Sequence, residues 1–466
     1  MNRVKLGDIL QIKHGYAFKS ENYVDKSPYA LVTLANISSS NNFQFTPEKT
    51  TYYGADFPDE FKLYEDDLIM PLTEQVVGLF GNSAFVPPIR GIQFVLNQRV
   101  GKVIPKDGKA DKYYLHYLLS TDTVRDQLEY RASGTRQRNI SPDDVYDVTV
   151  VIPDIEIQRK IGKILYGLER KINLNSKIND NLQHQLKLIY DYWFTQFDFP
   201  DKNSKPYRSS GGAMVWNEQL KRDIPADWQI TSITDNDLFQ IIKPGINNFK
   251  GDKTYLATAD IVGTTILNGN IINYETRESR ANMQPLLYSV WFAKMKNSIK
   301  HLNVGCKMKS IIDNYILSTG FCGLQCSKFS FEYVASFIEY SYFEVIKDTL
   351  AHGATQEAVN NDDLCNIFLL KPSDDVLRLY HKQTSSIFSQ ISTNICENQK
   401  LSALRDWLLP MLMNGQLSIM DEQEEQPQIN DLGFEQWLTN QGIAARGDVD
   451  MEVLRNIYEA MDDDDK

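Results

Sequence analysis

The sequence predicts an α/β (α+β) protein with two tandem mixed α/β domains and two long helices. Three observations support this fold class: an internal repeat at an offset of 219 residues, short β-rich runs in each copy, and a long helical pattern after each copy. At 466 residues the chain is long enough for two to three domains, each with its own core.

The repeat is clearest where GTRQRNISPDDV, residues 134–145, aligns without gaps on GATQEAVNNDDL, residues 353–364. Gly, Gln and both Asp are identical in the two segments. At the same offset Tyr114 aligns with Tyr333 and Pro153 with Pro372, and weaker echoes pair LQIKHG with FQIIKPG and Ala35-Asn36-Ile37 with Ala259-Asp260-Ile261. The chain is therefore a tandem of two related halves.

A long helix is expected after each half. Residues 155–194 contain no Pro, and apolar residues follow one seam with alternating spacings of three and four: Ile157, Ile161, Ile164, Leu168, Ile178, Leu182, Ile189 and Tyr192. Polar residues interrupt this seam (Lys171, Asn175, Gln185) and its counterpart in residues 376–409 (Gln383, Gln390, Asn394, Glu397). Because neither stripe is apolar enough to stand alone, we expect the two helices to pack on each other. Surface helices on two separate domains are the alternative.

The segment between the halves, residues 193–228, is rich in Pro, Gly, Ser and aromatic residues. A flexible tether would be dominated by Gly and Ser without bulky side chains. We therefore expect an ordered linker whose aromatic side chains dock on a domain.

The negative charge of the chain is concentrated at one end. The formal net charge is −12, but residues 420–466 hold 3 basic and 14 acidic residues, so the other 419 residues have a net charge of −1. Because phosphate binding depends on local patches, this total is compatible with DNA binding. A helix is expected at residues 449–458 of the tail. The sequence shows no signal peptide and no apolar run near 18 residues, which predicts a cytoplasmic protein with no membrane partner.

The five cysteines, an odd number in a chain without an export signal, are expected to be reduced thiols. His301 with Cys306, Cys322 and Cys326 is a conceivable zinc set. However, LSTGFCGLQCS alternates like a strand, which places Cys322 and Cys326 about 13 Å apart, whereas zinc needs sulfurs about 2.3 Å away. We interpret the cysteines as small buried hydrophobic residues.

The sequence shows no catalytic motif. It contains no Asn-Pro-Pro or Asp-Pro-Pro motif, no Gly-rich cofactor turn, no P-loop and no HExxH. Pro153-Asp154 followed by Glu169 and Lys171 satisfies a loose nuclease spacing, but Glu169 and Lys171 fall inside the expected helix rather than on a hairpin. A metal-dependent nuclease is therefore disfavoured.

Two stretches without acidic residues indicate surfaces that face phosphate. The first acid-free window, residues 75–106, contains Arg90, Gln93, Asn97, Gln98, Arg99 and Lys102. The second acid-free window, residues 279–312, contains Arg280, Lys294, Lys296, Lys300, Lys307 and Lys309. Lys and Arg bind the DNA backbone, while Gln, Asn and Arg can also reach base edges. The alternative for any one of these residues is a solvated surface position.

A third basic cluster surrounds Gly134. It contains Arg131, Arg136 and Arg138, whereas the second copy has Glu357 where Arg138 stands. The shared Gly and Gln are therefore interpreted as structural, and Arg136 and Arg138 are predicted to bind DNA.

Together these features resemble the specificity (S) subunits of type I restriction-modification systems. The resemblance is carried by the Gly-Thr-x-Gln-x-x-Ile-like turn of each half, the Pro and long helix that follow, GYAF at 15–18, the linker with FDFPD and SSGGAMVWNEQL, and LRDWLLPMLMNGQL at 404–417. It covers about residues 1–419. The chain departs from the pattern in its second turn, GATQEAV, and in its acidic tail.

The resemblance implies that each half is a target recognition domain that reads one part of a bipartite double-stranded DNA site. It implies recognition domains at 1–153 and 233–372, long helices at 154–195 and 373–418, an ordered linker at 196–232 and an acidic extension at 419–466. In that family the helices form an antiparallel coiled coil that separates the domains and docks two methyltransferase (M) subunits. Restriction/translocase (R) subunits join later. S-adenosylmethionine is expected in the methyltransferase partner, and no cofactor in this chain.

Three other functions fit parts of the same pattern. A specificity module of a different methyltransferase or nuclease architecture would show the same repeat. A self-contained modification enzyme would need a cofactor site, for which the sequence shows no motif. A coiled-coil scaffold without DNA binding would lack salt-dependent affinity for duplex DNA.

Overall fold

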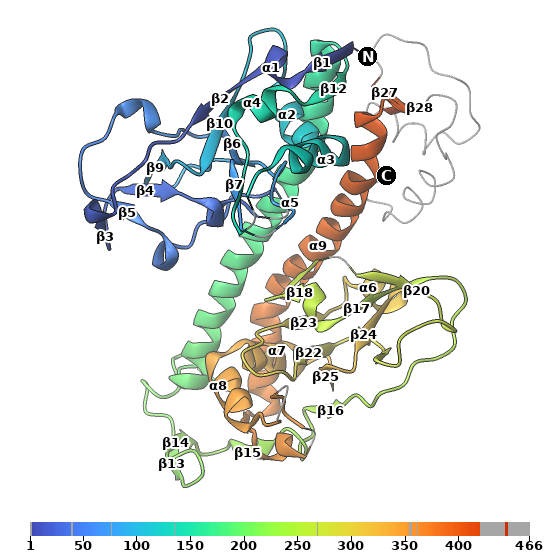
Figure 1. The fold of residues 1–466 in the computed structure, drawn as a ribbon. Coiled ribbons are helices and arrows are strands. Elements are labelled where there is room, and N and C mark those ends of the chain that lie inside the picture. The colour runs from blue at the N-terminus through green and yellow to red at the C-terminus, as the bar shows by residue number, and fades with distance from the viewer. Residues whose placement is uncertain are drawn as a thin grey trace. The chain divides into compact units, whose positions relative to one another are not determined.

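The computed structural model describes residues 2–38, 41–75, 77–134, 136–267, 269–353, 357–360, 362–419 and 443–445. The chain forms two compact units. Unit 1 comprises residues 1–170 and 402–466, and unit 2 comprises residues 171–401. Each unit therefore contains part of both long helices, α5 (Ile155–Tyr190) and α9 (Asp374–Met413) (Figure 1). No helix of the described residues is long and apolar enough to cross a membrane.

Unit 1 contains two four-stranded sheets beside short helices. The first sheet has the order β2 (Leu10–His14), β10 (Val100–Pro105), β6 (Leu68–Pro71) and β8 (Ala84–Phe85), and the second has the order β3 (Tyr23–Val24), β5 (Tyr52–Tyr53), β4 (Tyr29–Val32) and β9 (Gln93–Leu96). Two-strand ladders join β1 (Asn2–Lys5) to β12 (Thr149–Ile152) and β7 (Thr73–Glu74) to β11 (Arg138–Asn139). The α-helices are α1 (Leu6–Ile9), α2 (Lys112–Leu119), α3 (Asp122–Arg131) and α4 (Pro142–Tyr146), and short 3-10 turns lie at Ser20–Asn22, Leu34–Asn36, Pro47–Lys49 and Asp59–Phe61.

Unit 2 also contains two four-stranded sheets. The first has the order β16 (Phe239–Ile241), β25 (Phe321–Cys326), β22 (Ser289–Ala293) and β23 (His301–Val304), and the second has the order β20 (Asn270–Ile272), β17 (Lys253–Leu256), β24 (Tyr315–Ser318) and β21 (Ala281–Met283). Two-strand ladders join β15 (Gln229–Ser232) to β26 (Phe368–Lys371), β13 (Met214–Asn217) to β14 (Arg222–Pro225), and β18 (Ile261–Val262) to β19 (Thr265–Ile266). The α-helices are α6 (Lys309–Asn314), α7 (Phe331–Glu339) and α8 (Ser341–Leu350), with 3-10 turns at Thr258–Asp260 and Asp363–Asn366.

The two units share most of their topology, so the internal repeat predicted from the sequence is confirmed as a structural repeat. The first sheets have the same order, whereas the outer strand of the second sheet lies beside β5 in unit 1 (β3) and beside β24 in unit 2 (β21). In both, the first sheet begins with the strand that carries the LQIKHG or FQIIKPG echo. In both, the second sheet has one parallel pair, β4 with β9 in unit 1 and β17 with β24 in unit 2. The offset of 219 holds between α2 and α7, between α3 and α8, and between the first residues of α5 and α9.

Within unit 2, α5 and α9 pair antiparallel through the polar residues that interrupt the predicted seams. Asn175 Nδ2 donates to Glu397 Oε2 (2.6 Å) and Asn398 Oδ1 (2.9 Å), and Asn394 Nδ2 donates to Asn179 Oδ1 (2.7 Å). Residue numbers therefore rise along α5 as they fall along α9. The predicted packing of the two helices on each other is confirmed, and a buried polar pair of this kind fixes helix register.

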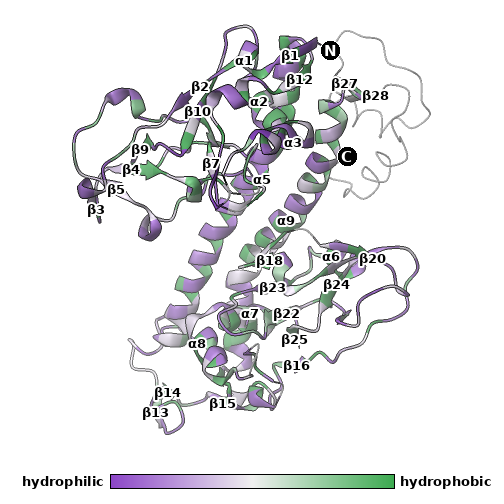
Figure 2. Cartoon of the chain, viewed as in Figure 1, coloured by the Kyte–Doolittle hydropathy of each residue, from purple (hydrophilic) through white to green (hydrophobic). Residues whose placement is uncertain are grey.

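The predicted apolar seam of α5 is partly wrong. Ile157, Ile178 and Tyr192 are exposed, whereas Leu165 and Leu186, which lie off that seam, are buried. The predicted seam follows a 3.5-residue repeat. In a straight helix with 3.6 residues per turn, such a row of side chains rotates around the helix by about 20° per heptad. Figure 2 shows hydrophilic residues along much of α5.

The linker after α5 is ordered, as its composition predicts. A π-helical turn (Asp191–Thr195) leads into the β13–β14 hairpin, and Phe197, Phe199 and Trp228 are buried in the core of unit 2. Phe199 stacks on Trp228 with ring centroids 5.0 Å apart. The aromatic side chains therefore attach the linker to unit 2.

The acidic tail is described only at β28 (Ile443–Ala445), which pairs antiparallel with β27 (Leu417–Ile419). The helix expected at residues 449–458 lies outside the described residues.

Candidate nucleic-acid interface

In unit 1, a buried carboxylate ties the arginine-rich turn to the start of the first acid-free window. Arg138 is the ladder partner of Glu74, and its Nη1 lies 3.0 Å from Glu74 Oε1. Glu74 is 1% exposed, and its Oε2 accepts the backbone N–H groups of Leu79 (2.9 Å) and Phe80 (3.3 Å). One side chain therefore fixes both the turn and the loop that follows β7.

Gly134 is required by the geometry of this turn. Its φ is +109°, and a Cβ atom there would lie 2.1 Å from the Gln137 carbonyl oxygen. The interpretation of this glycine as structural agrees with that geometry.

Unit 2 contains the same turn with the charges reversed. Lys296 N donates to Glu357 O (3.0 Å), and Lys296 Nζ lies 2.8 Å from Glu357 Oε2. Thus Lys296 takes the place of Glu74, and Glu357 takes the place of Arg138. Gly353, like Gly134, has a positive φ, of +141°. Residues 354–356, which include the Gln shared with the first turn, lie outside the described residues.

In the first acid-free window, the structure divides the predicted DNA-binding residues into two groups. Arg90, Gln98 and Arg99 are exposed. Gln93 Nε2 donates to Leu63 O (2.6 Å), Asn97 Oδ1 accepts from Gln98 N (2.7 Å), and Lys102 Nζ lies 2.7 Å from Asp67 Oδ2. The second group is engaged in holding its own loops and strands.

The second acid-free window divides in the same way. Arg280, Lys307 and Lys309 are exposed, and Lys309 begins α6. Lys294 and Lys300 are half-buried; the carbonyl of Lys294 accepts from Val359 N (3.0 Å), and Lys300 Nζ donates to the carbonyl of Thr258. Lys296 is the ion-paired residue of the turn.

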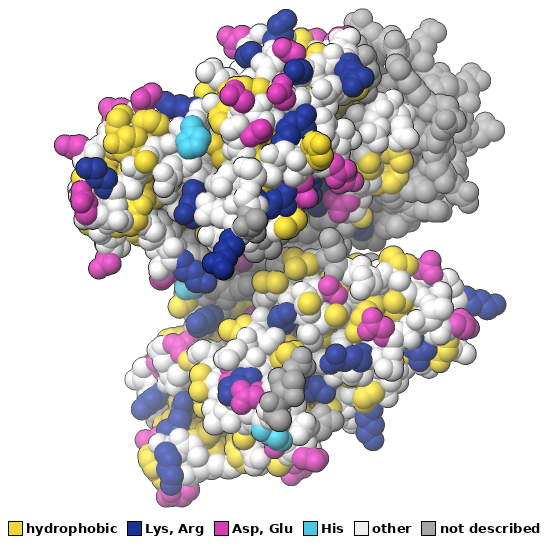
Figure 3. Space-filling view, viewed as in Figure 1, with side chains coloured by type: hydrophobic (Ala, Val, Ile, Leu, Met, Phe, Trp, Pro, Cys, Tyr) yellow, Lys and Arg dark blue, Asp and Glu magenta, His cyan; other side chains and the backbone are white. Residues whose placement is uncertain are grey.

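A stretch of sequence without acidic residues is therefore not a surface without acidic residues. Asp67, Glu74 and Glu357 lie outside the windows in sequence and neutralise basic residues in space. Figure 3 shows Lys and Arg interspersed with Asp and Glu over the visible face. Of the predicted residues, seven keep exposed side chains: Arg90, Gln98, Arg99, Arg136, Arg280, Lys307 and Lys309.

Sequence reasoning missed an exposed apolar stripe that runs along the unit 2 part of α5 and into the π-helical turn that follows it. Leu174, Ile178, Leu188 and Tyr192 are 52%, 39%, 57% and 40% exposed. Their positions fit spacings of three and four, with Asn181 and Gln185 completing the row. Plotting the helix at 3.6 residues per turn would have separated this stripe from the buried face.

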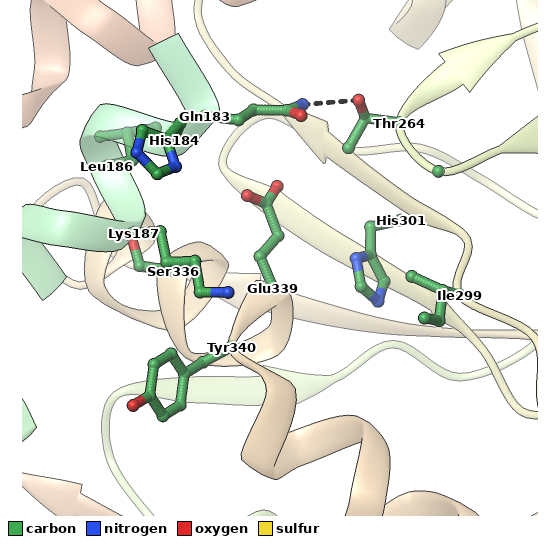
Figure 4. Close-up of a pocket in the computed structure, with 11 residues that line it drawn as sticks. Gln183, His184, Leu186, Lys187, Thr264, Ile299, His301, Ser336, Glu339 and Tyr340 are labelled. Atoms are coloured by element: carbon green, nitrogen blue, oxygen red, sulfur yellow. Dashed lines mark hydrogen bonds between the residues drawn. The ribbon is translucent and has the colours of Figure 1, made fainter. Parts of the chain in front are cut away.

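A cavity of about 250 Å³ in unit 2 holds a cluster of polar side chains (Figure 4). Gln183 donates to Thr264 at its rim, and Glu339 points into it. Burial raises the pKa of Glu339, which accepts a hydrogen bond from Asn303. Beside it, His301 Nε2 lies 2.9 Å from Glu344, which also binds the fully buried Lys347. Each of these buried charges thus has a partner of opposite or polar character.

The described residues contain no group of three or more His, Cys, Asp or Glu side chains that could hold a metal ion. Cys322 and Cys326 are buried on β25, and burial raises the pKa of the Cys322 thiol to about 12. Cys306 and Cys365 are exposed, so the interpretation of the cysteines as buried residues is wrong for these two. The residues of the loose nuclease spacing have structural partners: Glu169 accepts from Tyr117 Oη (2.7 Å), and Lys171 pairs with Glu397.

Residues 1–184 match the type I restriction modification DNA specificity domain. The match covers the first 184 of the 466 residues. The MjaIX specificity subunit of Methanocaldococcus jannaschii is 24% identical to the chain over 343 residues, covering 69% of this chain and 73% of that protein. The HindI specificity subunit of Haemophilus influenzae is also 24% identical, covering 64% and 76%. These relatives are specificity subunits, and they confirm the resemblance predicted from the sequence.

A crystal structure of the S subunit from M. genitalium aligns with 88% of this chain and 95% of that chain, at 13% identity and a TM-score of 0.48. The match to the specificity domain ends within α5, so it includes only residues 171–184 of unit 2. The shared topology of the two units identifies unit 2 as a second copy of the same framework.

Proposed function

We propose that this chain is the non-catalytic DNA specificity subunit of a type I restriction-modification complex, in which each unit reads one half of a bipartite target. The observation that carries this proposal is one framework present twice with different exposed side chains. The order of the first sheet, the presence of one parallel pair in the second sheet and the glycine turn are the same in both units, whereas Arg136 of the first turn and the Lys307–Lys309 segment of unit 2 are particular to one unit. Two similar scaffolds with different surfaces suit two different half-sites.

The exposed residues of the predicted set are the proposed contacts to DNA. In unit 1 these are Arg90, Gln98, Arg99 and Arg136, and in unit 2 they are Arg280, Lys307 and Lys309. Such side chains bind phosphates and place the reading loops against the bases. The partly buried residues, namely Gln93, Asn97, Lys102, Arg138, Lys294, Lys296 and Lys300, hold these loops in place.

The exposed stripe on α5 is the proposed docking site for a methyltransferase subunit. A row of large apolar side chains in contact with solvent is typical of a protein interface. By the repeat, α9 provides the second docking helix, so that two methyltransferase subunits bind. S-adenosylmethionine would enter with them, and restriction/translocase subunits would join the assembled complex on DNA.

A salt titration of DNA binding tests this proposal. The complex with its methyltransferase partner should bind duplex DNA with an affinity that falls steeply with salt. Changing Lys307 and Lys309 together to Ala should lower the slope of log K against log salt by about 1.8, which is 0.9 for each lost phosphate contact. Lys202→Ala with Lys205→Ala in the linker removes the same charge from exposed positions and is the control.

The outcomes separate the competing functions. Equal slopes for the wild type and the Lys307/Lys309 variant would place the phosphate contacts of unit 2 elsewhere. A complex without salt-dependent affinity for DNA would be a coiled-coil scaffold. Methylation by the isolated chain would identify a self-contained enzyme and contradict the proposal.

A further inference from the structure

The loops that follow the two ion-paired residues share a pattern. Gln75 follows Glu74 and is succeeded two residues later by Val77, while Asn297 follows Lys296 and is succeeded two residues later by Ile299. The offset of 222 also relates the ladder residues before them, because Thr73 pairs with Asn139 and Met295 with Ala358. An amide and then a β-branched aliphatic residue thus occupy equivalent places in the two units.

These side chains project into solvent in both units. Val77 is 66% exposed and Ile299 is 61% exposed, and Gln75 and Asn297 are also exposed. A single exposed aliphatic residue is ordinary on a protein surface. Two at equivalent positions of a repeat, each beside an exposed amide, indicate a shared use of that position.

Both loops are anchored by buried charged groups. In unit 1 the Glu74 carboxylate accepts from Leu79 N and Phe80 N, immediately beyond Val77. In unit 2 the fully buried Lys347 donates to Ser298 O (3.1 Å), and Asn297 N donates to Asp348 Oδ1 (3.1 Å). Hydrogen bonds therefore hold residues next to these exposed side chains, which favours a binding site.

An amide and an aliphatic group together match one base pair of DNA. In the major groove, Gln or Asn can bond to adenine N6 and N7, and an apolar side chain can contact the thymine methyl group. Two residues of backbone span at most about 7 Å, so both side chains can reach the same base pair. In unit 1, Arg136 precedes β11 at the same end of the β7–β11 ladder, where it can bind the adjacent phosphate.

We propose that Gln75 with Val77 and Asn297 with Ile299 each read one A·T pair, one in each half of the target. This inference rests on the proposed function and adds to it a base-pair class and the residues that read it. The amide specifies adenine, and the aliphatic side chain specifies the methyl group of the paired thymine.

Replacing thymine by uracil tests the proposal, because uracil lacks only the methyl group. Once the target is known from its methylated adenines, each thymine of both half-sites is replaced in turn, and binding by the complex with its methyltransferase is measured. One uracil in each half-site should weaken binding by about four-fold, the value for one buried methyl group. Val77→Ala should abolish this sensitivity in one half-site only, and Ile299→Ala in the other only.

Further variants make the test specific. Gln75→Ala should weaken binding roughly 5- to 140-fold at the base pair that Val77 senses. Val215→Ala, at an exposed valine of the linker hairpin, should leave both uracil effects unchanged. If no thymine is sensitive to uracil, or if Val77→Ala keeps the sensitivity, the proposal is wrong.

Two other results would also be decisive. If Val77→Ala weakened methyltransferase assembly and left the uracil effects intact, the loop would be a protein contact and the proposal would be wrong. If the wild-type complex showed no sequence-specific DNA binding, the proposed function itself would be wrong. The failures of the two proposals are therefore distinguishable.

Discussion

The ion pairs Arg138–Glu74 and Lys296–Glu357 occupy equivalent places in the two units. Replacing the cation of each pair by Ala should lower the free energy of unfolding much more for Arg138→Ala than for Lys296→Ala. Arg138 pairs with Glu74, whose side chain is 1% exposed. Lys296 pairs with Glu357, and these side chains are 35% and 49% exposed. Removing the partner of a buried charge leaves that charge without compensation, whereas an exposed pair contributes little.

The magnitudes follow from this difference in burial. Breaking a fully buried pair costs about 3–5 kcal/mol. Because Arg138 is 21% exposed and Glu74 keeps two backbone donors, we expect a cost of about 2–3 kcal/mol for Arg138→Ala. For Lys296→Ala the expected cost is about 0–1 kcal/mol.

Hydrogen exchange measures these costs locally. In Arg138→Ala, the amides of β7 and β11 should exchange about 30- to 140-fold faster than in the wild type. In Lys296→Ala, the exchange rates of the amides at position 296 and of Val359 should change by less than about 6-fold. Equal acceleration in the two variants, or none in Arg138→Ala, would refute the burial argument.

Three further predictions concern the helices. Burial opposes the ionisation of Glu169, but the nearby His116 ring and the hydrogen bond from Tyr117 outweigh it and lower the pKa of Glu169 below its usual 4.5. Ionised Glu169 therefore stabilises unit 1 above pH 4.5, and this advantage over Glu169→Gln in urea unfolding should shrink as the pH falls below 4.5. Asn179→Leu alone should cost about 1–3 kcal/mol by leaving Asn394 Nδ2 without its acceptor, whereas Asn179→Leu combined with Asn394→Leu should recover most of this cost in the same assay. Leu188→Glu, at a 57% exposed position, should abolish methyltransferase binding in size-exclusion chromatography and change the free energy of unfolding by less than about 0.5 kcal/mol; retained binding would contradict docking on this stripe.

The repeat and the long helices could be predicted because they depend on local sequence. The offset of 219 residues between Gly134 and Gly353 also separates the first residues of α5 and α9. The periodicity of these helices can be recognised in the sequence without knowledge of tertiary contacts. Strand order could not be predicted in this way. The parallel pairing of β4 with β9 joins residues more than 60 positions apart, and nothing in either strand specifies its partner.

The candidate site was less predictable because charge balance is decided in space. Lys102 and Lys296 belong to acid-free windows, yet Asp67 and Glu357 lie against them. Glu74 lies directly before the first acid-free window. It organises the turn because its side chain is buried, and the sequence does not show whether a given acidic residue is buried. The predicted DNA-binding residues stay predictions, and the structure indicates which of them keep exposed side chains.

Mapping methylated adenines tests the central claim most directly. DNA is sequenced from cells that express this chain with its methyltransferase partner, and from cells that express the partner with a chain in which Lys307 and Lys309 are Ala. The account predicts methylated adenine in one bipartite motif, two short half-sites separated by an unread gap, with reduced occupancy in the variant. Methylation that occurs without this chain would contradict the proposed function, and so would a methylated motif that consists of one uninterrupted sequence.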